Sequence, residues 1–359
     1  MNKFNNKNRG AITNPEGRFE NYITEDFDDG WGSNIDDEDL PTLETTLLID
    51  PSKSIISRND SPDIGFDQSI NPYKGCEHGC IYCYARPTHE YLNLSPGLDF
   101  ESKIFYKPDA AKLLEKEINK PSYVCKTIVI GANTDPYQPA ESKLKITRSL
   151  LEVALAYHHP VGIISKSSLV LRDMDILKKL AEKNLVKVAI TITTLSVELK
   201  KILEPRASSP SGRLNAIRQL SENNIPVRVM AAPMIPMIND MELEHILQSA
   251  QKAGATHAGY TFIRLPHAVK TLFKEWLQTH YPDRAEHVMS LIRQMRNGKE
   301  YDSTFGNRMR GEGKFAELLA MRFKLACKKF HLNAKPDSAL DTHQFTKKKV
   351  ETPQLSFDI

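Results

Sequence analysis

Cys76-Glu77-His78-Gly79-Cys80-Ile81-Tyr82-Cys83 is the stretch that decides how this 359-residue chain is interpreted. Its three cysteines are spaced C-x3-C-x2-C and follow a turn-forming segment at residues 71–75. A short loop that contains glycine can curl, so three thiolates at this spacing can point at one small object. A [4Fe-4S] cluster takes four ligands. Three cysteines would therefore leave one iron open to a further ligand.

Two other readings of the cysteines compete with a cluster. A zinc ion would need a fourth ligand, and His78 lies inside the loop. Zinc loops more often use C-x2-C pairs separated by a dozen or more residues, and this chain has no second pair. A structural disulfide would leave one of the three cysteines over. We therefore favour the cluster and expect His78 to be a solvated loop residue.

Composition bounds the class of protein. Hydrophobic residues make up 40% of the chain and the net charge is +3, so no overall field indicates nucleic acid or a membrane. Five cysteines, three of them clustered, predict a reducing cytoplasm rather than a disulfide scaffold. No apolar run approaches the roughly 20 residues that span a bilayer, and the first residues lack the apolar core of a signal peptide. These features predict a soluble cytoplasmic protein.

The middle of the chain alternates between strand and helix patterns. Short β-branched runs predict buried parallel strands, and apolar residues at helical spacing separate them. The expected strands lie at 69–71, 127–132, 161–165, 187–193, 226–231 and 257–263, and the expected helices at 108–119, 142–157, 174–183, 211–223 and 240–253. Six βα units predict an α/β fold, a partial (β/α)6 TIM-like barrel. A doubly wound open sheet is the alternative, but no G-x-G-x-x-G follows the first strand.

Four regions are expected along the chain. Residues 1–45 read as a disordered acidic arm, because they carry too little apolar surface to fold alone. The barrel core spans 46–265. Helical patterns at 268–278, 284–296 and 314–330 predict a C-terminal helical extension over 266–335, and residues 336–359 read as a disordered tail.

Polar residues gather where the expected strands end, which is where function sits in barrels of this kind. The strand-end segments are Asn133-Thr134-Asp135-Pro136-Tyr137-Gln138-Pro139, Ser165-Lys166-Ser167, Thr191-Ile192-Thr193-Thr194 with Glu204-Pro205-Arg206 beyond it, and residues 232–240. Each segment taken alone is compatible with ordinary turn and cap chemistry. As a set they predict a rim of donors and charges around one site.

These motifs together resemble a known family. The cysteine loop is typical of radical S-adenosylmethionine (SAM) enzymes. The segments 58–66, 69–73, 76–89, 133–139, Leu203-Glu204-Pro205-Arg206 and Ala232-Pro233-Met234-Ile235-Pro236 resemble the radical SAM proteins grouped with spore photoproduct lyase and often labelled "DNA repair photolyase". The resemblance covers about residues 45–335. It implies an enzyme that cleaves SAM reductively at a [4Fe-4S] cluster and uses the 5′-deoxyadenosyl radical to abstract hydrogen.

The resemblance also implies roles for individual residues. Three cysteines would hold the cluster, and the other positions would contact SAM. The expected ligands are Cys76, Cys80 and Cys83 for the cluster, Tyr82 for the adenine, Asn133, Thr134 and Asp135 for the methionine amine and nearby groups, Lys166 for the carboxylate, Thr193 for the ribose, and Arg206 for the carboxylate or the substrate. In spore photoproduct lyase a hydrogen-donating cysteine precedes the second-strand motif, whereas here Ala132 and Asn133 occupy that neighbourhood.

Partners are expected on the same basis. The chain would take electrons from an external donor of the flavodoxin or ferredoxin type, and its substrate is expected to be a nucleic acid or nucleotide. Gln354-Leu355-Ser356-Phe357 faintly resembles peptides that dock on the bacterial sliding clamp, although the expected leucine before the phenylalanine is missing. The alternative function is a non-catalytic iron–sulfur or zinc-binding adaptor, or a redox sensor, in DNA metabolism.

Overall fold

A seven-stranded sheet forms the centre of the computed structural model, which describes residues 8–19 and 42–347. Six of its strands are parallel, and β2 pairs antiparallel with β3 at one edge. In spatial order the strands are β10 (His257–Phe262), β9 (Val227–Met234), β8 (Val186–Thr191), β7 (Val161–Ser165), β6 (Ile128–Ile130), β3 (Gln68–Ile70) and β2 (Ile56–Arg58). Most residues of β6, β7 and β8 are buried, as expected for short β-branched runs inside a parallel sheet.

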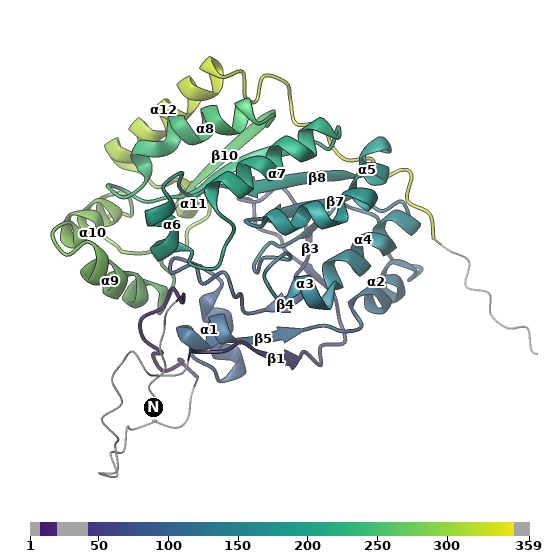
Figure 1. The fold of residues 1–359 in the computed structure, drawn as a ribbon, viewed down its shortest axis with the longest axis horizontal. Coiled ribbons are helices and arrows are strands. Elements are labelled where there is room, and N and C mark those ends of the chain that lie inside the picture. The colour runs from purple at the N-terminus through teal and green to yellow at the C-terminus, as the bar shows by residue number, and fades with distance from the viewer. Residues whose placement is uncertain (1–7, 20–41, 348–359) are drawn as a thin grey trace, which may run out of the picture.

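Helices separate the parallel strands along the chain (Figure 1). They are α2 (Ala110–Ile118), α3 (Glu141–Leu144), α4 (Ile146–Ala156), α5 (Met174–Glu182), α6 (Val197–Leu203), α7 (Pro210–Glu222) and α8 (Leu243–Lys252). Local sequence explains where some of them begin. The Ser209 side chain accepts a hydrogen bond from the backbone of Gly212, and Pro210 takes the first helical position of α7.

The expected mixed α/β fold with a parallel sheet is confirmed, but the partial barrel is not. From β3 to β10 each parallel strand pairs with the next one in the chain, without the reversal in strand order that marks a doubly wound sheet. In the described part of the chain no ladder joins β10 to β2 or β3, so there is no closed barrel. The chain continues from β10 into helices rather than into further strands.

A second, three-stranded sheet supports the cysteine loop. Its order is β1 (Thr46–Ile49), β5 (Lys103–Tyr106) and β4 (Tyr73–Lys74), and the short helix α1 (Leu98–Ser102) leads into β5. Because β4 ends two residues before Cys76, the loop begins directly from this small sheet. The backbone N–H of Cys76 also donates to the carbonyl of Phe100 in α1 at 2.9 Å.

Helices follow β10, as the sequence predicts. They are α9 (Val269–His280), α10 (Ala285–Gln294), α11 (Asn307–Arg310) and α12 (Gly313–Lys329). Trp276 of α9 is fully buried and donates its indole N–H to the carbonyl of Ile202 in α6 at 3.0 Å. Arg322 of α12 pairs with Glu244 of α8 at 2.6 Å, which fixes α12 alongside α8 (Figure 1). No helix among the described residues is long and apolar enough to cross a membrane.

Both terminal segments differ from the sequence expectation where the structure describes them. Gly10 and Ala11, expected in a disordered arm, are buried and bonded to Glu101. In the tail, Phe345 lies edge-on to the rings of Tyr123 and His159. In the structure, partners distant in the sequence thus hold parts of residues 8–19 and 336–347. Residues 1–7, 20–41 and 348–359, including the clamp-like stretch at 354–357, lie outside the described residues.

Candidate functional site

The cysteine loop is fixed by backbone bonds from elements on both sides. Besides the bond from Cys76, the backbone N–H of Ile81 donates to the carbonyl of Leu203 at 3.1 Å, and that of Arg206 donates to the carbonyl of His78 at 3.2 Å. The segment after α6 is thus bound to the loop at two points. All three cysteines are unpaired thiols; Cys76 and Cys80 are buried and Cys83 is half-buried. A loop held this closely presents its sulfurs without needing to reorganise.

A buried ion pair holds the loop from the side of α1. Arg86 is fully buried, donates from Nε to the carbonyl of Cys80 at 3.0 Å, and pairs with the equally buried carboxylate of Glu101. Its Nη1 donates to the carbonyls of Pro96 at 3.1 Å and Gly97 at 2.9 Å. Because an unpaired charge in this position would be very costly, Arg86 and Glu101 stabilise one conformation of the loop.

The surroundings of the three thiols bear on whether they can bind a metal. Burial raises the pKa of Cys76, and the negative charges of Asp135, Cys80 and Cys83 raise it further. Burial also raises the pKa of Cys80, as does the carboxylate of Glu204. Nearby iron would reverse this effect, because a metal deprotonates the thiols that coordinate it. The donor set therefore fits an iron–sulfur cluster.

The spacing of the sulfurs also bears on the kind of metal. Within residues 8–19 and 42–347, no three His, Cys, Asp or Glu side chains converge closely enough to hold one metal ion. A cubane cluster does not require such convergence, because each of its cysteines binds a different iron. The absence of such convergence is therefore compatible with three cysteines that would each bind a separate iron.

A buried charged network lies beside the loop. Glu204 accepts hydrogen bonds from the Tyr82 hydroxyl and from the Thr193 hydroxyl, the latter at 2.6 Å, and forms an ion pair with Arg213. The ammonium of Lys166 lies 4.0 Å from the Glu204 carboxylate and 5.9 Å from the centre of the Tyr82 ring. Burial favours the neutral acid, but Arg213 and the other donors outweigh it and lower the pKa of Glu204 to about 2. Glu204 is therefore a buried anion that gathers three of the predicted SAM contacts.

Asp135 joins two strand-end loops next to Cys76. Its carboxylate accepts from the Ser165 hydroxyl at 2.8 Å and from the backbone N–H of Lys166 at 2.6 Å. The negative charge of Asp135 raises the pKa of the Cys76 thiol, and His78 Nδ1 lies 3.4 Å from the Asp135 carboxylate. Asp135 follows β6 and Lys166 follows β7, and these two parallel strands are neighbours in the sheet. The two loops therefore leave the same edge of the sheet and lie side by side.

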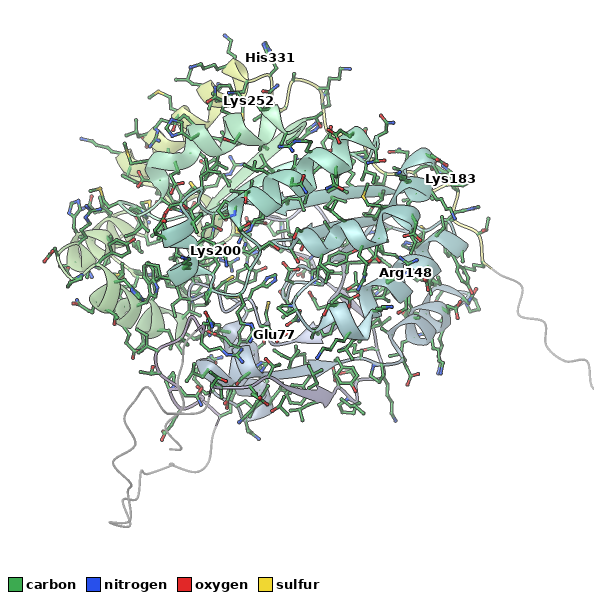
Figure 2. All side chains as sticks on the ribbon, in the orientation of Figure 1. Glu77, Arg148, Lys183, Lys200, Lys252 and His331 are labelled. Carbon is green, nitrogen blue, oxygen red and sulfur yellow. The ribbon has the colours of Figure 1, made fainter. Side chains whose placement is uncertain are left out.

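The remaining predicted SAM contacts are differently placed. Thr134 is buried and its hydroxyl donates to the carbonyl of Tyr73 at 2.7 Å, whereas the side chain of Asn133 is exposed. Arg206 pairs with Glu77 of the cysteine loop at 2.9 Å (Figure 2 labels Glu77). The structure thus brings Tyr82, Lys166 and Thr193 into one group, and it leaves Asn133 and Arg206 outside that group.

His78 was expected in solvent, and this prediction is wrong: its exposed fraction is 2%. Burial lowers the pKa of the imidazole, so it is neutral at pH 7. An open cavity of about 500 Å³ lies against His78, between the loops that follow β6, β7 and α6. The residues lining this cavity are His78, Tyr137, Pro139, Ser142, Ser167, Ser168, Leu169, Arg172, Arg206, Ala207 and Ser208.

Sequence reasoning also missed the partners that orient the site. Glu204 stands beside Pro205 and Arg206 in the sequence, but no local pattern marks it as a buried anion. Nothing local marks Arg213, on α7, as its counter-charge. Likewise, nothing in the sequence around Arg86 indicates that it forms a buried ion pair with Glu101.

An aromatic and cationic rim adjoins Cys83. Tyr84 is 42% exposed and donates its hydroxyl to the carbonyl of Ala132, while the Arg264 guanidinium lies 5.0 Å from the centre of its ring. Arg264 also contacts Met309 at 3.6 Å, which brings the loop around α11 to this rim. On that loop the Arg308 guanidinium lies 4.6 Å from the centre of the Phe305 ring.

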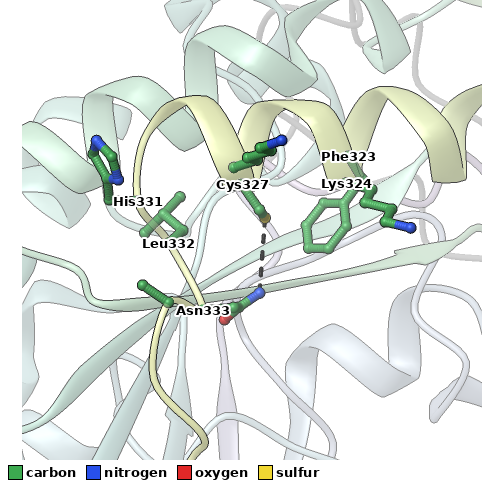
Figure 3. A pocket seen from close by; sticks show the side chains of 8 residues that line it. Phe323, Lys324, Cys327, His331, Leu332 and Asn333 are labelled. Carbon is green, nitrogen blue, oxygen red and sulfur yellow. Dashed lines mark hydrogen bonds between the residues drawn. The ribbon is translucent and has the colours of Figure 1, made fainter.

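A second cavity, of about 470 Å³, lies between α12 and residues 331–334 (Figure 3). Cys327 lines it and accepts a 3.7 Å hydrogen bond from the Asn333 amide. Burial raises the pKa of this thiol to about 11, so it is protonated at neutral pH. Cys327 therefore behaves as a small buried hydrophobe.

Comparisons with known proteins agree with this geometry. The family model for the radical SAM superfamily matches residues 70–250. An uncharacterized protein of Mycobacterium tuberculosis is 32% identical over 230 residues, 64% of this chain and 68% of that protein. One from Methanocaldococcus jannaschii is 30% identical over 217 residues, 60% of this chain and 77% of that protein.

Solved structures extend the comparison to the fold. Spore photoproduct lyase complexed with dinucleoside spore photoproduct has a TM-score of 0.57 at 16% identity, with 79% of each chain covered. A C140A/S76C mutant of that enzyme with bound AdoMet and dinucleoside spore photoproduct has a TM-score of 0.53 at 15% identity, over 79% of this chain and 78% of that one. At such identities the likeness establishes the fold alone.

Proposed function

The chain belongs to the radical SAM superfamily, and on this premise we propose that it is an enzyme that cleaves SAM reductively and abstracts hydrogen from a substrate. The observation that carries the proposal is the position of three unpaired, buried or half-buried cysteines beside the Lys166–Glu204–Tyr82 network. When bound, a [4Fe-4S] cluster and SAM supply the electron and the 5′-deoxyadenosyl radical.

Individual residues of the network suit the binding of SAM. Cys76, Cys80 and Cys83 would hold the cluster. The ammonium of Lys166 would attract the SAM carboxylate as a compact charge, and the carboxylate of Asp135 would attract the amine. These two opposite charges come from loops joined by the bond from the Lys166 backbone N–H to Asp135, and an amino-acid group carries the same two charges.

Other residues would fix the rest of the ligand. Glu204 anchors the hydroxyls of Tyr82 and Thr193, so a nucleoside would meet an ordered surface rather than mobile side chains. Thr134 would contribute next to Asp135, and Asn133 and Arg206 are proposed as contacts nearer the solvent, for SAM or the substrate.

The electron would come from an external protein of the flavodoxin or ferredoxin type. A second cluster in this chain would need further cysteine ligands, and only Cys125 and Cys327 remain outside the loop. Unpaired thiols throughout the described residues favour a reducing compartment, for which we propose the cytoplasm.

We propose a nucleic acid or nucleotide as the substrate. Tyr84 and Phe305 are 42% and 54% exposed, and aromatic rings of this kind can stack on bases. Arg264 lies over the ring of Tyr84, and Arg308 lies over the ring of Phe305. Spore photoproduct lyase, which shares the fold, was solved in complex with dinucleoside spore photoproduct. The position of this rim beside Cys83 would bring a bound base close to the site of radical formation.

The central test measures metal and product together. Anaerobic reconstitution is expected to give about four irons per chain. Addition of dithionite and SAM should then yield 5′-deoxyadenosine, detected by chromatography. Cys80→Ala should abolish both, while the matched control Cys327→Ala, in the distant cavity, should change neither. A fully loaded protein that forms no product would contradict the proposal, and one zinc per chain without visible absorbance would indicate the adaptor instead.

The substrate class needs its own test. Binding of a labelled single-stranded oligonucleotide is followed by fluorescence anisotropy over a range of salt concentrations. Arg264→Met should weaken binding and lower the slope of log Kd against log salt by about 0.7, the value for one lost phosphate contact. Arg293→Met is the control, because the Arg293 guanidinium pairs with Glu286 on α10 and does not lie over either aromatic ring of the rim. Equal slopes for both variants and the wild type would argue against a nucleic acid at this rim.

A further inference from the structure

Residues 8–19, which we call the N-terminal strap, lie directly against the cysteine loop. A Cβ atom added to Gly10 would be 1.7 Å from the carbonyl oxygen of Gly79, the residue just before Cys80. A Cβ added to Gly79 would in turn lie 3.2 Å from the backbone nitrogen of Gly10. The two backbones therefore touch with no room for a side chain on the strap, so the contact depends on glycine at position 10.

Hydrogen bonds connect the strap to the second cysteine. The backbone N–H groups of Gly10 and Ala11 donate to the two carboxylate oxygens of Glu101, each at 2.9 Å. Glu101 is fully buried and pairs with Arg86, whose Nε donates to the carbonyl of Cys80. Two of the donors that satisfy the buried carboxylate thus come from the strap. Without them Glu101 would lose part of the solvation that it needs as a buried anion.

The other end of the strap contacts the last strand–helix unit. The Thr13 hydroxyl donates to Glu275 of α9 at 2.7 Å. Arg18 pairs with Glu90 at 2.7 Å, and its Nη1 lies 3.0 Å from Nδ1 of His267, between β10 and α9. In Figure 1 this segment, drawn in purple, lies between α1 and α9. The strap therefore joins the cysteine loop to the segment that follows β10, which is one edge strand of the sheet. In the described chain this edge does not pair with the opposite edge.

We propose that the N-terminal strap is part of the cluster site. It holds the cysteine loop in the conformation that binds the cluster, through Gly10 on Gly79 and through Glu101 and Arg86 to Cys80. It also packs over Gly79 and reaches across to Glu275 of α9, and by covering this side of the loop it limits access of water and oxygen. The inference rests on the proposed function, since it concerns the retention of the cluster that this function requires.

The test compares two glycine-to-alanine variants. Gly10→Ala places a methyl group into the Gly79 carbonyl, whereas a Cβ at Gly65 meets no atom within 4 Å in the described chain, so Gly65→Ala is the matched control. Wild type and both variants are loaded with iron and sulfide under argon. Iron loss to a chelator is followed under argon, and bleaching of the visible absorbance is followed in air.

Gly10→Ala is expected to lose iron about 10-fold faster than the wild type, the lower end of the effect of residues that orient metal ligands. Gly65→Ala should match the wild type in both measurements. Circular dichroism of the iron-free proteins shows whether the main fold is intact. If Gly10→Ala does not fold, Arg18→Met tests the same proposal from the far end of the strap, where faster bleaching in air supports it and an unchanged rate overturns it.

Failure of the strap proposal is distinguishable from failure of the proposed function. A wild-type protein that retains no iron after reconstitution would contradict the function itself. A wild-type protein that retains iron, together with a folded Gly10→Ala variant that releases it at the same rate, would overturn the role of the strap and leave the function standing.

Discussion

Replacing Glu204 by glutamine tests the buried network most directly. Glu204→Gln keeps the shape of the side chain and can still accept hydrogen bonds from Tyr82 and Thr193. It removes the negative charge that faces Arg213, whose guanidinium is also buried and which donates to the carbonyls of Ser208 at 3.0 Å and Thr191 at 3.1 Å. The variant therefore leaves the buried Arg213 without its counter-charge and turns an amide N–H toward its guanidinium, and it also removes the carboxylate that lies 4.0 Å from Lys166.

The expected loss of stability follows from two arguments. The pKa of Glu204 falls from 4.5 to about 2 in the folded protein, against the effect of burial and because of Arg213 and the other donors. At about 1.4 kcal/mol for each pH unit between these values, the folded state favours the carboxylate by about 3 kcal/mol. Breaking a buried ion pair costs about 3–5 kcal/mol. Both arguments predict a loss of about 3 kcal/mol.

Urea unfolding of the iron-free protein, followed by circular dichroism at pH 7, measures this loss. Glu286→Gln is the control, because Glu286 pairs with Arg293 on the surface of α10 with 81% of its side chain exposed. Its expected effect is about 0.5 kcal/mol or less. A Glu204→Gln variant within about 1 kcal/mol of the wild type would refute the reasoning from a buried, charged Glu204.

The pH dependence gives a second check. Because the folded pKa of Glu204 is depressed, its contribution is fully present above about pH 4.5 and is lost only as the pH falls toward 2. The difference between wild type and Glu204→Gln should therefore stay constant between pH 8 and 5. A difference that shrinks across this range would mean that Glu204 takes up a proton near neutrality, contrary to the geometry.

Three further predictions concern other parts of the molecule. Lys166→Met should weaken SAM binding about 10- to 100-fold without loss of iron, by equilibrium dialysis, whereas the exposed control Lys143→Met should not; unchanged affinity would contradict the proposed carboxylate contact. Burial lowers the pKa of His159 to about 4, so on acidification the unfolded chain binds a proton before the folded protein does. Between pH 7 and pH 5 the free energy of unfolding of the wild type should therefore fall by about 2 kcal/mol more than that of His159→Gln. Equal falls for the two proteins in urea unfolding would contradict a buried, neutral His159. Phe345→Ala should cost about 1–2 kcal/mol and speed limited proteolysis after residue 335, because the ring lies 5.7 Å from that of Tyr123; a cleavage rate equal to the wild type would mean that this contact does not hold the tail.

The parallel strands were predictable because each signal is local. Val161–Ser165 has the bounds expected from its apolar run, and β6 falls inside the expected 127–132. The helix expected over 142–157 is interrupted instead at Lys145, which has a left-handed φ of 52°. Glu141 explains the break, because its carboxylate accepts from the backbone of Thr147 at 3.0 Å and so stabilises a new helix start. No glycine marks this position in the sequence.

The parts of the site that escaped prediction depend on partners distant in the chain. Gly10 lies in a polar stretch without apolar periodicity, and what orders it is Glu101, 91 residues away. His78 reads as a loop histidine, yet loops that follow α6 and β7 bury it. Buried ion pairs have no periodic signature, since only the fold decides which two charges meet. The sequence could therefore place the ligands at strand ends but not the charges that orient them.

Two buried ion pairs act on different parts of the site, and this has a consequence for how the site can fail. Arg86–Glu101 contacts the carbonyl of Cys80, whereas Arg213–Glu204 contacts the side chain of Tyr82. Loss of the first pair should therefore lower the retention of iron, and loss of the second should lower the affinity for SAM in protein that still carries iron. Each pair contacts the cysteine loop directly, the first at Cys80 and the second at Tyr82. If a variant of either pair lowers iron retention and SAM affinity equally, the two ion pairs do not act separately, and the loop responds to the loss of either as one unit.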